Sequence, residues 1–131
     1  MATKRPVVLI VDDIGDVRLA FRLLLESAKF RVLEAADAYA ALRCLRKEKV
    51  DLVLTDLYMP GELDGIGLVD IIRNKVSAEL PVIAMSGSPH LAYRSSLQAA
   101  QFVGANATLT KTVRADVLFG TINSLLEARP A

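Results

Sequence analysis

The chain has 131 residues, of which 53% are hydrophobic, and it carries 16 Lys and Arg against 15 Asp and Glu. This length and composition suit one compact domain, so we expect a single domain over residues 1–131 with its core at about 6–128. Because the charges nearly balance and form no block of one sign, we expect no nucleic-acid partner and no binding to an anionic membrane.

The apolar runs and the cysteine content of the sequence indicate the compartment in which the protein is expected. No apolar run reaches the roughly 18 residues that a membrane-spanning helix needs, and Asp12 interrupts the first run too early for a signal peptide. Cys44 is the single cysteine, which excludes an internal disulfide and fits a reducing compartment. We therefore expect a cytoplasmic protein.

Short apolar runs rich in Val, Ile and Leu alternate with longer segments of helical periodicity. The short runs are typical of buried parallel strands. The expected strands are Val7–Asp12, Arg31–Ala36, Asp51–Asp56, Pro81–Ser86 and Ala107–Lys111. The expected helices are Asp16–Ser27, Ala38–Lys47 with Asp37 as its cap, Ile66–Lys75, Pro89–Phe102 and Arg114–Glu127. This strict alternation predicts a doubly wound α/β sandwich with a parallel sheet between two layers of helices.

Polar side chains stand at the carboxyl ends of four predicted strands. The first strand ends in Asp12-Asp13, and the third, fourth and fifth end in Asp56, Ser86 and Lys111. In an open sheet of order 2-1-3-4-5, ligands bind beyond the carboxyl ends of the strands, between strands 1 and 3. We therefore expect these five side chains to gather at one edge of the sheet.

The chemistry of this group of side chains indicates a cation and a phosphoryl ligand. Three carboxylates in close contact repel one another, and one pKa would rise unless a cation compensates. Oxygen ligands with room for water suit Mg²⁺ better than Zn²⁺. Lys111 adds a fixed positive charge and Ser86 a hydroxyl donor, a combination that stabilises phosphoryl oxygens. Taken alone, Asp12 and Asp13 would also fit a strand end and a helix cap.

Four segments occur in the order, and at nearly the spacing, of a known family: "VLIVDD", "DLVLTDLYMPGELDG", "PVIAMSG" and "GANATLTK". Through them the chain resembles the response-regulator receiver domains of two-component signalling, which are CheY-like. The resemblance covers essentially the whole chain. It implies a flavodoxin-like fold of five strand-helix units with the strand order 2-1-3-4-5.

The resemblance also implies a role for each polar residue at the strand ends. Asp56 would accept a phosphoryl group from a sensor histidine kinase or a histidine phosphotransfer protein. Ser86 and Lys111 would contact that phosphoryl group. The groups implied to hold Mg²⁺ are Asp12 through water, Asp13, Asp56 and the backbone carbonyl of Tyr58.

The implied output is contact with another protein and not catalysis, so we expect no enzyme activity of its own. The expected docking face is formed by the fourth helix, the fifth strand and the fifth helix, and a homodimer is compatible with this interpretation. Because the chain ends soon after the fifth helix, we expect no attached DNA-binding or catalytic domain.

The sequence departs from the family pattern at several positions. Thr108 stands where an aromatic residue usually couples phosphorylation to the outer face. Thr112 replaces the proline that usually follows the lysine, so we predict either a trans bond before Thr112 or a strained cis bond, which costs about 2.5–4 kcal/mol before a non-proline residue. The turn "MPGELDG" and the span from Ser86 to Gly104 are longer than usual. Tyr58 is expected to lean over the pocket and to slow hydrolysis.

Two other interpretations are compatible with parts of the sequence, and two more are disfavoured. The chain is alternatively a docking or dimerisation module that works without phosphorylation, which Thr108 and Thr112 favour, or a receiver fragment of a hybrid kinase. A phosphatase with an aspartyl nucleophile usually has a second acid two residues later, where this chain has Tyr58. A nucleotide-binding domain is disfavoured because the chain has neither a G-x-G-x-x-G motif nor a Walker lysine.

Overall fold

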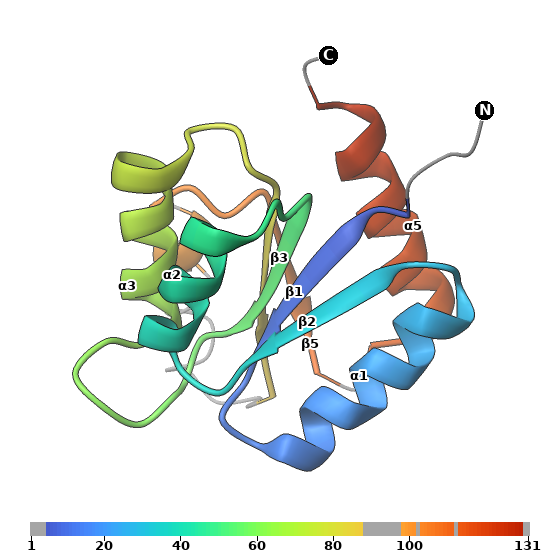
Figure 1. Cartoon of the computed structure of the whole chain (residues 1–131), viewed down its shortest axis with the longest axis horizontal. Helices are drawn as coiled ribbons and strands as arrows, with labels where there is room; N and C mark the ends of the chain where they lie inside the picture. Colours follow the sequence, from blue (N-terminus) through green and yellow to red (C-terminus); the bar gives the residue numbers. More distant parts are fainter. Residues whose placement is uncertain (1–4, 88–97, 102, 112, 130–131) are drawn as a thin grey trace.

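The computed structural model describes residues 5–87, 98–101, 103–111 and 113–129. At its centre lies a parallel five-stranded sheet in the order β2-β1-β3-β4-β5 (Figure 1). The predicted doubly wound, flavodoxin-like fold is therefore confirmed. The strands are β1 (Val7–Val11), β2 (Arg31–Ala35), β3 (Leu52–Asp56), β4 (Val82–Ser86) and β5 (Ala107–Thr110).

Helices cover both faces of this sheet, with α1 and α5 on one face and α2 and α3 on the other (Figure 1). One turn of π-helix, η1, continues α3. Among the residues described, no helix has the length and apolar character needed to cross a membrane. The helices are α1 (Gly15–Ser27), α2 (Ala38–Lys47), α3 (Gly65–Ile71), η1 (Ile72–Val76) and α5 (Ala115–Glu127).

The predicted strands and helices agree with these bounds to within one residue at either end, when α3 and η1 together are compared with the expected helix Ile66–Lys75. The exception is the expected helix Pro89–Phe102. Residues 98–101 of it are helical, and its other residues lie outside the described part of the chain. Asp37 caps α2 as predicted, because its Oδ1 accepts a hydrogen bond from the Ala40 N–H at 2.7 Å.

Alternate residues of β1 enter two separate hydrophobic cores. Val8 and Ile10 pack into the core beneath α1 and α5, whereas Leu9 and Val11 pack into the core beneath α2 and α3. Successive side chains of a strand point to opposite faces, so β1 is buried on both sides. β3 and β4 are also buried throughout, which explains why these strands read as continuous apolar runs.

The register of the sheet brings the carboxyl ends of the strands to one edge. Val11 of β1 lies opposite Thr55 of β3, and Asp56 lies opposite Met85 of β4. Ser86, the last residue of β4, lies one step further along. The rigid, doubly covered strands therefore present the side chains at their ends to a common site.

Candidate functional site

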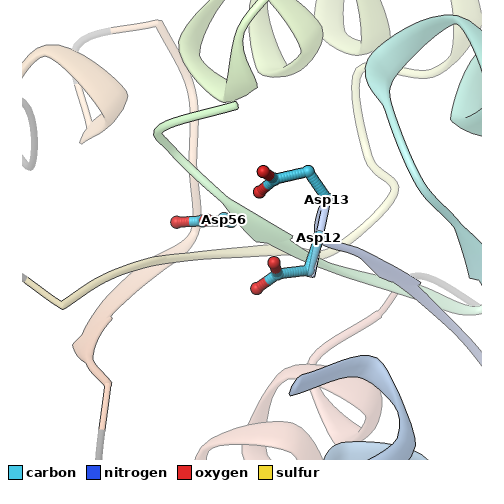
Figure 2. A group of neighbouring side chains, drawn as sticks. All are labelled: Asp12, Asp13 and Asp56. Carbon is cyan, nitrogen blue, oxygen red and sulfur yellow. The ribbon is translucent and has the colours of Figure 1, made fainter. Parts of the chain in front are cut away.

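Three carboxylates meet at the carboxyl edge of the sheet. Asp12 and Asp13 follow β1, and Asp56 is the last residue of β3. One oxygen of each lies within 4.8 Å of the others (Figure 2). Asp12 and Asp56 are buried, with 2% and 6% of their surface exposed, whereas Asp13 is exposed. The structure thus brings the three predicted acids together, with one side of the group open to solvent.

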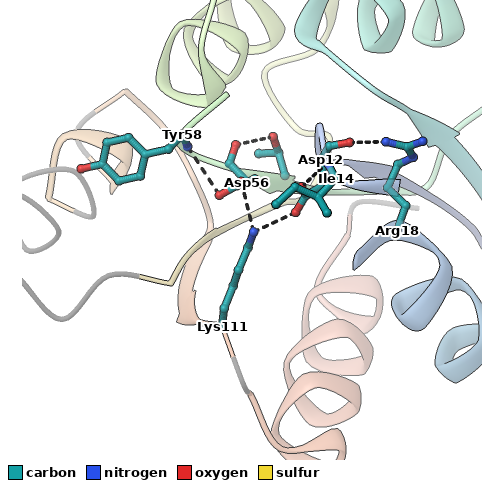
Figure 3. Close-up of polar contacts among 7 residues, drawn as sticks. Asp12, Ile14, Arg18, Asp56, Tyr58 and Lys111 are labelled. Carbon is teal, nitrogen blue, oxygen red and sulfur yellow. Dashed lines mark hydrogen bonds and ion pairs between the residues drawn. The ribbon is translucent and has the colours of Figure 1, made fainter. Parts of the chain in front are cut away.

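Lys111 joins the two buried carboxylates from the residue after β5. Its Nζ donates to Oδ2 of Asp12 at 2.8 Å and to Oδ2 of Asp56 at 3.1 Å (Figure 3). Burial alone would disfavour the ammonium, but these two carboxylates raise the pKa of Lys111 above its usual value. Lys111 is therefore a fixed positive charge inside the site.

One ammonium does not balance three carboxylates. Burial raises the pKa of Asp56, the bond from Lys111 opposes that rise, and the nearby charge of Asp12 adds to it. Within the described residues, the Asp13 carboxylate makes no hydrogen bond or ion pair. A divalent cation would relieve this repulsion, and carboxylate oxygens are the ligands that Mg²⁺ prefers. The donor set therefore fits Mg²⁺.

Backbone groups hold the two buried acids in place. The Ile14 N–H donates to Oδ1 of Asp12 at 2.9 Å, and the Tyr58 N–H lies 3.4 Å from Oδ1 of Asp56. The main chain of Tyr58 therefore lies beside the acids. Tyr58 is 48% exposed and its ring points away from the cluster (Figure 3), so the expectation that the ring leans over the pocket was wrong. That Tyr58 slows hydrolysis stays a prediction.

Ser86 supplies a buried hydroxyl at the same edge. The residue is completely buried, and its Oγ has no hydrogen-bond partner in the described part of the chain. Buried polar groups in folded proteins are almost always paired. An unpaired buried hydroxyl at the end of β4, next to the strand that carries Asp56, is a donor that an incoming ligand can satisfy.

Tight backbone packing positions Asp56 itself. A Cβ atom on Gly65, at the start of α3, would lie 2.0 Å from the carbonyl oxygen of Asp56. The loop after β3 folds back directly onto Asp56, so that no side chain fits at position 65. The Thr55 hydroxyl donates to the same carbonyl at 2.9 Å.

Arg18 is a contact of the site that sequence reasoning missed. Its Nη1 donates to the carbonyl oxygen of Asp12 at 2.6 Å (Figure 3). The signal available was its place near the start of the helix that follows the two acids, but nothing in the sequence indicates a bond to a main-chain atom.

Some of the positions at which the sequence departs from the family pattern lie within the described residues, and others do not. Thr108 lies in β5 opposite Ala84 of β4 and is partly buried, without a ring to pack. Thr112 lies outside the described residues, and so does most of the longer span between Ser86 and Gly104.

Two solved structures share this architecture. A response regulator receiver protein from Pseudomonas putida superposes with a TM-score of 0.81 at 30% identity, covering 94% of this chain and 99% of that one. The chemotaxis protein CheY4 of Vibrio cholerae gives 0.81 at 25% identity, with 92% and 98% covered.

Curated relatives include regulators and sensor kinases. The chain is 36% identical to the transcriptional regulatory protein GlrR of Escherichia coli K12 over 127 residues, which is 97% of this chain and 28% of that protein. It is 30% identical over 119 residues to the autoinducer sensor kinase/phosphatase CqsS of Vibrio cholerae, covering 88% of this chain and 16% of that protein. The chain therefore spans less than a third of either relative.

The sequence also matches a protein-family model. The model described as "Response regulator receiver domain" matches residues 8–123, a range that contains the acid cluster, Ser86 and Lys111. Together with the sheet order and the site at its carboxyl edge, this match shows that the chain belongs to the receiver-domain family of two-component response regulators.

Proposed function

We propose that the chain is a Mg²⁺-dependent phosphoacceptor, and that Asp56 receives its phosphoryl group from a sensor histidine kinase or a histidine phosphotransfer protein. The observation that carries this proposal is the surroundings of Asp56. Its buried carboxylate is bound by Lys111, and the hydroxyl of Ser86 on the adjacent strand has no partner within the described residues. A purely structural ion pair needs no unpaired donor, whereas a phosphoryl group offers acceptors to both Lys111 and Ser86.

In the proposed reaction, a carboxylate oxygen of Asp56 attacks the phosphorus of a phosphohistidine. The new O–P bond forms as the P–N bond breaks, and the electron pair of the broken bond stays on the imidazole nitrogen. The ring leaves neutral when its other nitrogen carries a proton. Lys111 opposes the effect of burial on the Asp56 pKa and so favours the ionised nucleophile.

The proposed metal ligands are Asp12, Asp13, Asp56 and the carbonyl of Tyr58. When bound, Mg²⁺ would supply positive charge against the phosphoryl oxygens. Lys111 would then contact the phosphoryl group from the β5 side, and the Ser86 hydroxyl would donate to it from β4.

We also propose where the protein acts and which surface contacts its downstream partner. The chain would act as one receiver domain in the cytoplasm, alone or as a homodimer, without enzyme activity of its own. Its downstream partner would be a protein that contacts the face of the fourth helix, β5 and α5. In support, β5 is an edge strand of the sheet, and Val117 of α5 is 45% exposed.

The test is the mass of the intact protein after incubation with Mg²⁺ and acetyl phosphate. Wild type should gain one phosphoryl group, and Asp56→Asn should gain none. Asp51→Asn is the matched control, because Asp51 directly precedes β3 and Asp56 ends it. Omitting the metal should also abolish the gain. A modification that persists in Asp56→Asn, or that does not need Mg²⁺, would contradict the proposal.

A docking module that works without phosphorylation is the second candidate. Thr108 favours it, because a threonine at this position of β5 has no ring that could swing inward on phosphorylation. Binding of Mg²⁺ without any gain of a phosphoryl group, from acetyl phosphate or from a kinase, would favour this candidate.

A further inference from the structure

One guanidinium holds the peptide group between the two acids that follow β1. Nη1 of Arg18 donates to the carbonyl oxygen of Asp12 at 2.6 Å (Figure 3). Nε of the same side chain donates to Oε1 of Glu34 at 3.1 Å. Because Glu34 lies in β2 and Asp12 follows β1, Arg18 ties the turn that carries the acids to the neighbouring strand.

Asp13 depends on this peptide group for its position. Lys111 anchors the carboxylates of Asp12 and Asp56, but within the described residues no donor holds the carboxylate of Asp13. The carbonyl of Asp12 and the N–H of Asp13 belong to one planar unit. The bond from Arg18 therefore fixes the plane from which the Asp13 side chain starts.

We propose that Arg18 is a positioning residue that orients Asp13 toward Mg²⁺, and that Glu34 keeps the guanidinium of Arg18 in place. This inference rests on the proposed function, because it concerns the same metal site. A ligand that is ordered before the metal arrives loses less conformational freedom on binding. Residues that orient metal ligands typically contribute about 10–100-fold to metal affinity.

The charge of Arg18 by itself would act in the opposite direction. A guanidinium beside a divalent-cation site repels the cation, so its removal would strengthen Mg²⁺ binding if charge alone mattered. Positioning predicts weaker binding after the same change. The sign of the effect therefore separates the two explanations.

The test is calorimetric titration of the purified chain with MgCl₂, in wild type, Arg18→Met and Arg18→Lys. We expect Arg18→Met to bind Mg²⁺ about tenfold more weakly. Arg18→Lys keeps the charge, yet it should also bind more weakly, because an ammonium lacks the rigid fork that reaches two acceptors at once. Thermal unfolding checks that each variant is folded at the temperature of the titration.

Arg22→Met is the matched control. Arg22 lies one turn further along α1 and also pairs with Glu34, through Nη1 and Oε2 at 2.7 Å, but it makes no bond to the acid cluster among the contacts described. This variant removes the same charge from the same helix and should bind Mg²⁺ as wild type does.

Four results would overturn the inference. Wild-type or stronger Mg²⁺ binding by folded Arg18→Met would exclude positioning. Wild-type binding by Arg18→Lys would show that the two-acceptor geometry is not needed. An equal loss in Arg22→Met would show that the bond from Arg18 to the Asp12 carbonyl is not the cause, because Arg22 pairs with Glu34 but makes no such bond among the contacts described. If wild type itself binds no Mg²⁺, the metal part of the proposed function fails together with this inference.

Discussion

Lys111 and Asp12 form an ion pair of 2.8 Å although 99 positions separate them in the sequence. In the sheet, β3 and β4 lie between the strands that precede these two residues. The Lys111 side chain therefore reaches across the strand ends to the first strand of the fold and contacts Asp56 on the way. A single ammonium thereby links β5, β3 and β1 at the candidate site.

Replacing Lys111 by Met should destabilise the protein. The change leaves Asp12 and Asp56 buried without their counter-charge, and the loss of one partner from a buried pair costs about 3 kcal/mol. The measurement is urea unfolding with EDTA present. Added Mg²⁺ should restore part of the lost stability, because the cation replaces the missing charge.

Lys49→Met is the control for this prediction, because Lys49 is exposed and lies in a loop. It should change the free energy of unfolding by less than about 0.5 kcal/mol. Equal stability of Lys111→Met and wild type in EDTA would mean that the buried pair does not stabilise the fold.

Gly65→Ala should destabilise the protein and displace Asp56. The added Cβ would lie 2.0 Å from the carbonyl oxygen of Asp56, so the backbone must move, which we expect to cost more than about 2 kcal/mol. Gly120→Ala is the opposite case. Gly120 is exposed within α5, and a Cβ there meets nothing within 4 Å.

Urea unfolding measures the free energy of unfolding of both glycine variants. Alanine is favoured over glycine in a helix interior by about 1 kcal/mol, so Gly120→Ala should stabilise the protein. A wild-type stability for Gly65→Ala would show that the loop after β3 can relax away from Asp56.

Lys29→Gly should stabilise the protein. Lys29 follows α1 with a φ of 72°, in the left-handed region that glycine occupies without strain. Its N–H donates to the Glu26 carbonyl at 3.0 Å, as expected at a helix end. Relief of the strain should raise the free energy of unfolding by about 0.5–1 kcal/mol.

The comparison for Lys29→Gly is Lys29→Ala, which removes the charge but keeps the Cβ atom. If thermal unfolding shows the same gain for both variants, the charge of Lys29 and not its backbone conformation is the cause.

Asp51→Asn should reveal a pH-dependent contribution to stability. Burial disfavours the charged form of Asp51, but the Val7 N–H at 2.8 Å and Arg129 at 2.7 Å lower its pKa below the usual 3.8. A lowered pKa adds stability above the unfolded value, and this stability is lost as the pH falls through the folded value. At pH 7 the variant should therefore be less stable by about 1–2 kcal/mol.

The measurement for Asp51 is urea unfolding at a series of pH values. The difference between wild type and Asp51→Asn should shrink below about pH 4. A difference that stays constant down to pH 3 would assign the effect to hydrogen-bond geometry and not to the charge.

Most of the fold could be predicted because its signals are local. The apolar runs of β1, β3 and β4 follow from burial on both faces of the sheet, and helical spacing marks α1, α2 and α5. The polar residues at the strand ends could be predicted to meet because parallel strands joined by crossovers end at a common edge.

The direction of the Tyr58 ring could not be predicted. Its backbone lies beside Asp56, as expected, but the ring points away from the acids. Side-chain direction depends on the φ and ψ angles of an irregular loop, and the loop after β3 has no periodic pattern from which these angles could be inferred.

The sequence by itself determined the order of strands and helices and the five side chains at the carboxyl edge, because burial and periodicity act over short stretches of chain. Only the tertiary structure decided which groups pair within the site. The bonds from Lys111 to Asp12 and from Arg18 to the Asp12 carbonyl, and the unpaired hydroxyl of Ser86 among the described residues, depend on distances of a few ångströms between side chains and backbone groups of different elements. Such distances are set by register and packing, which no local pattern encodes.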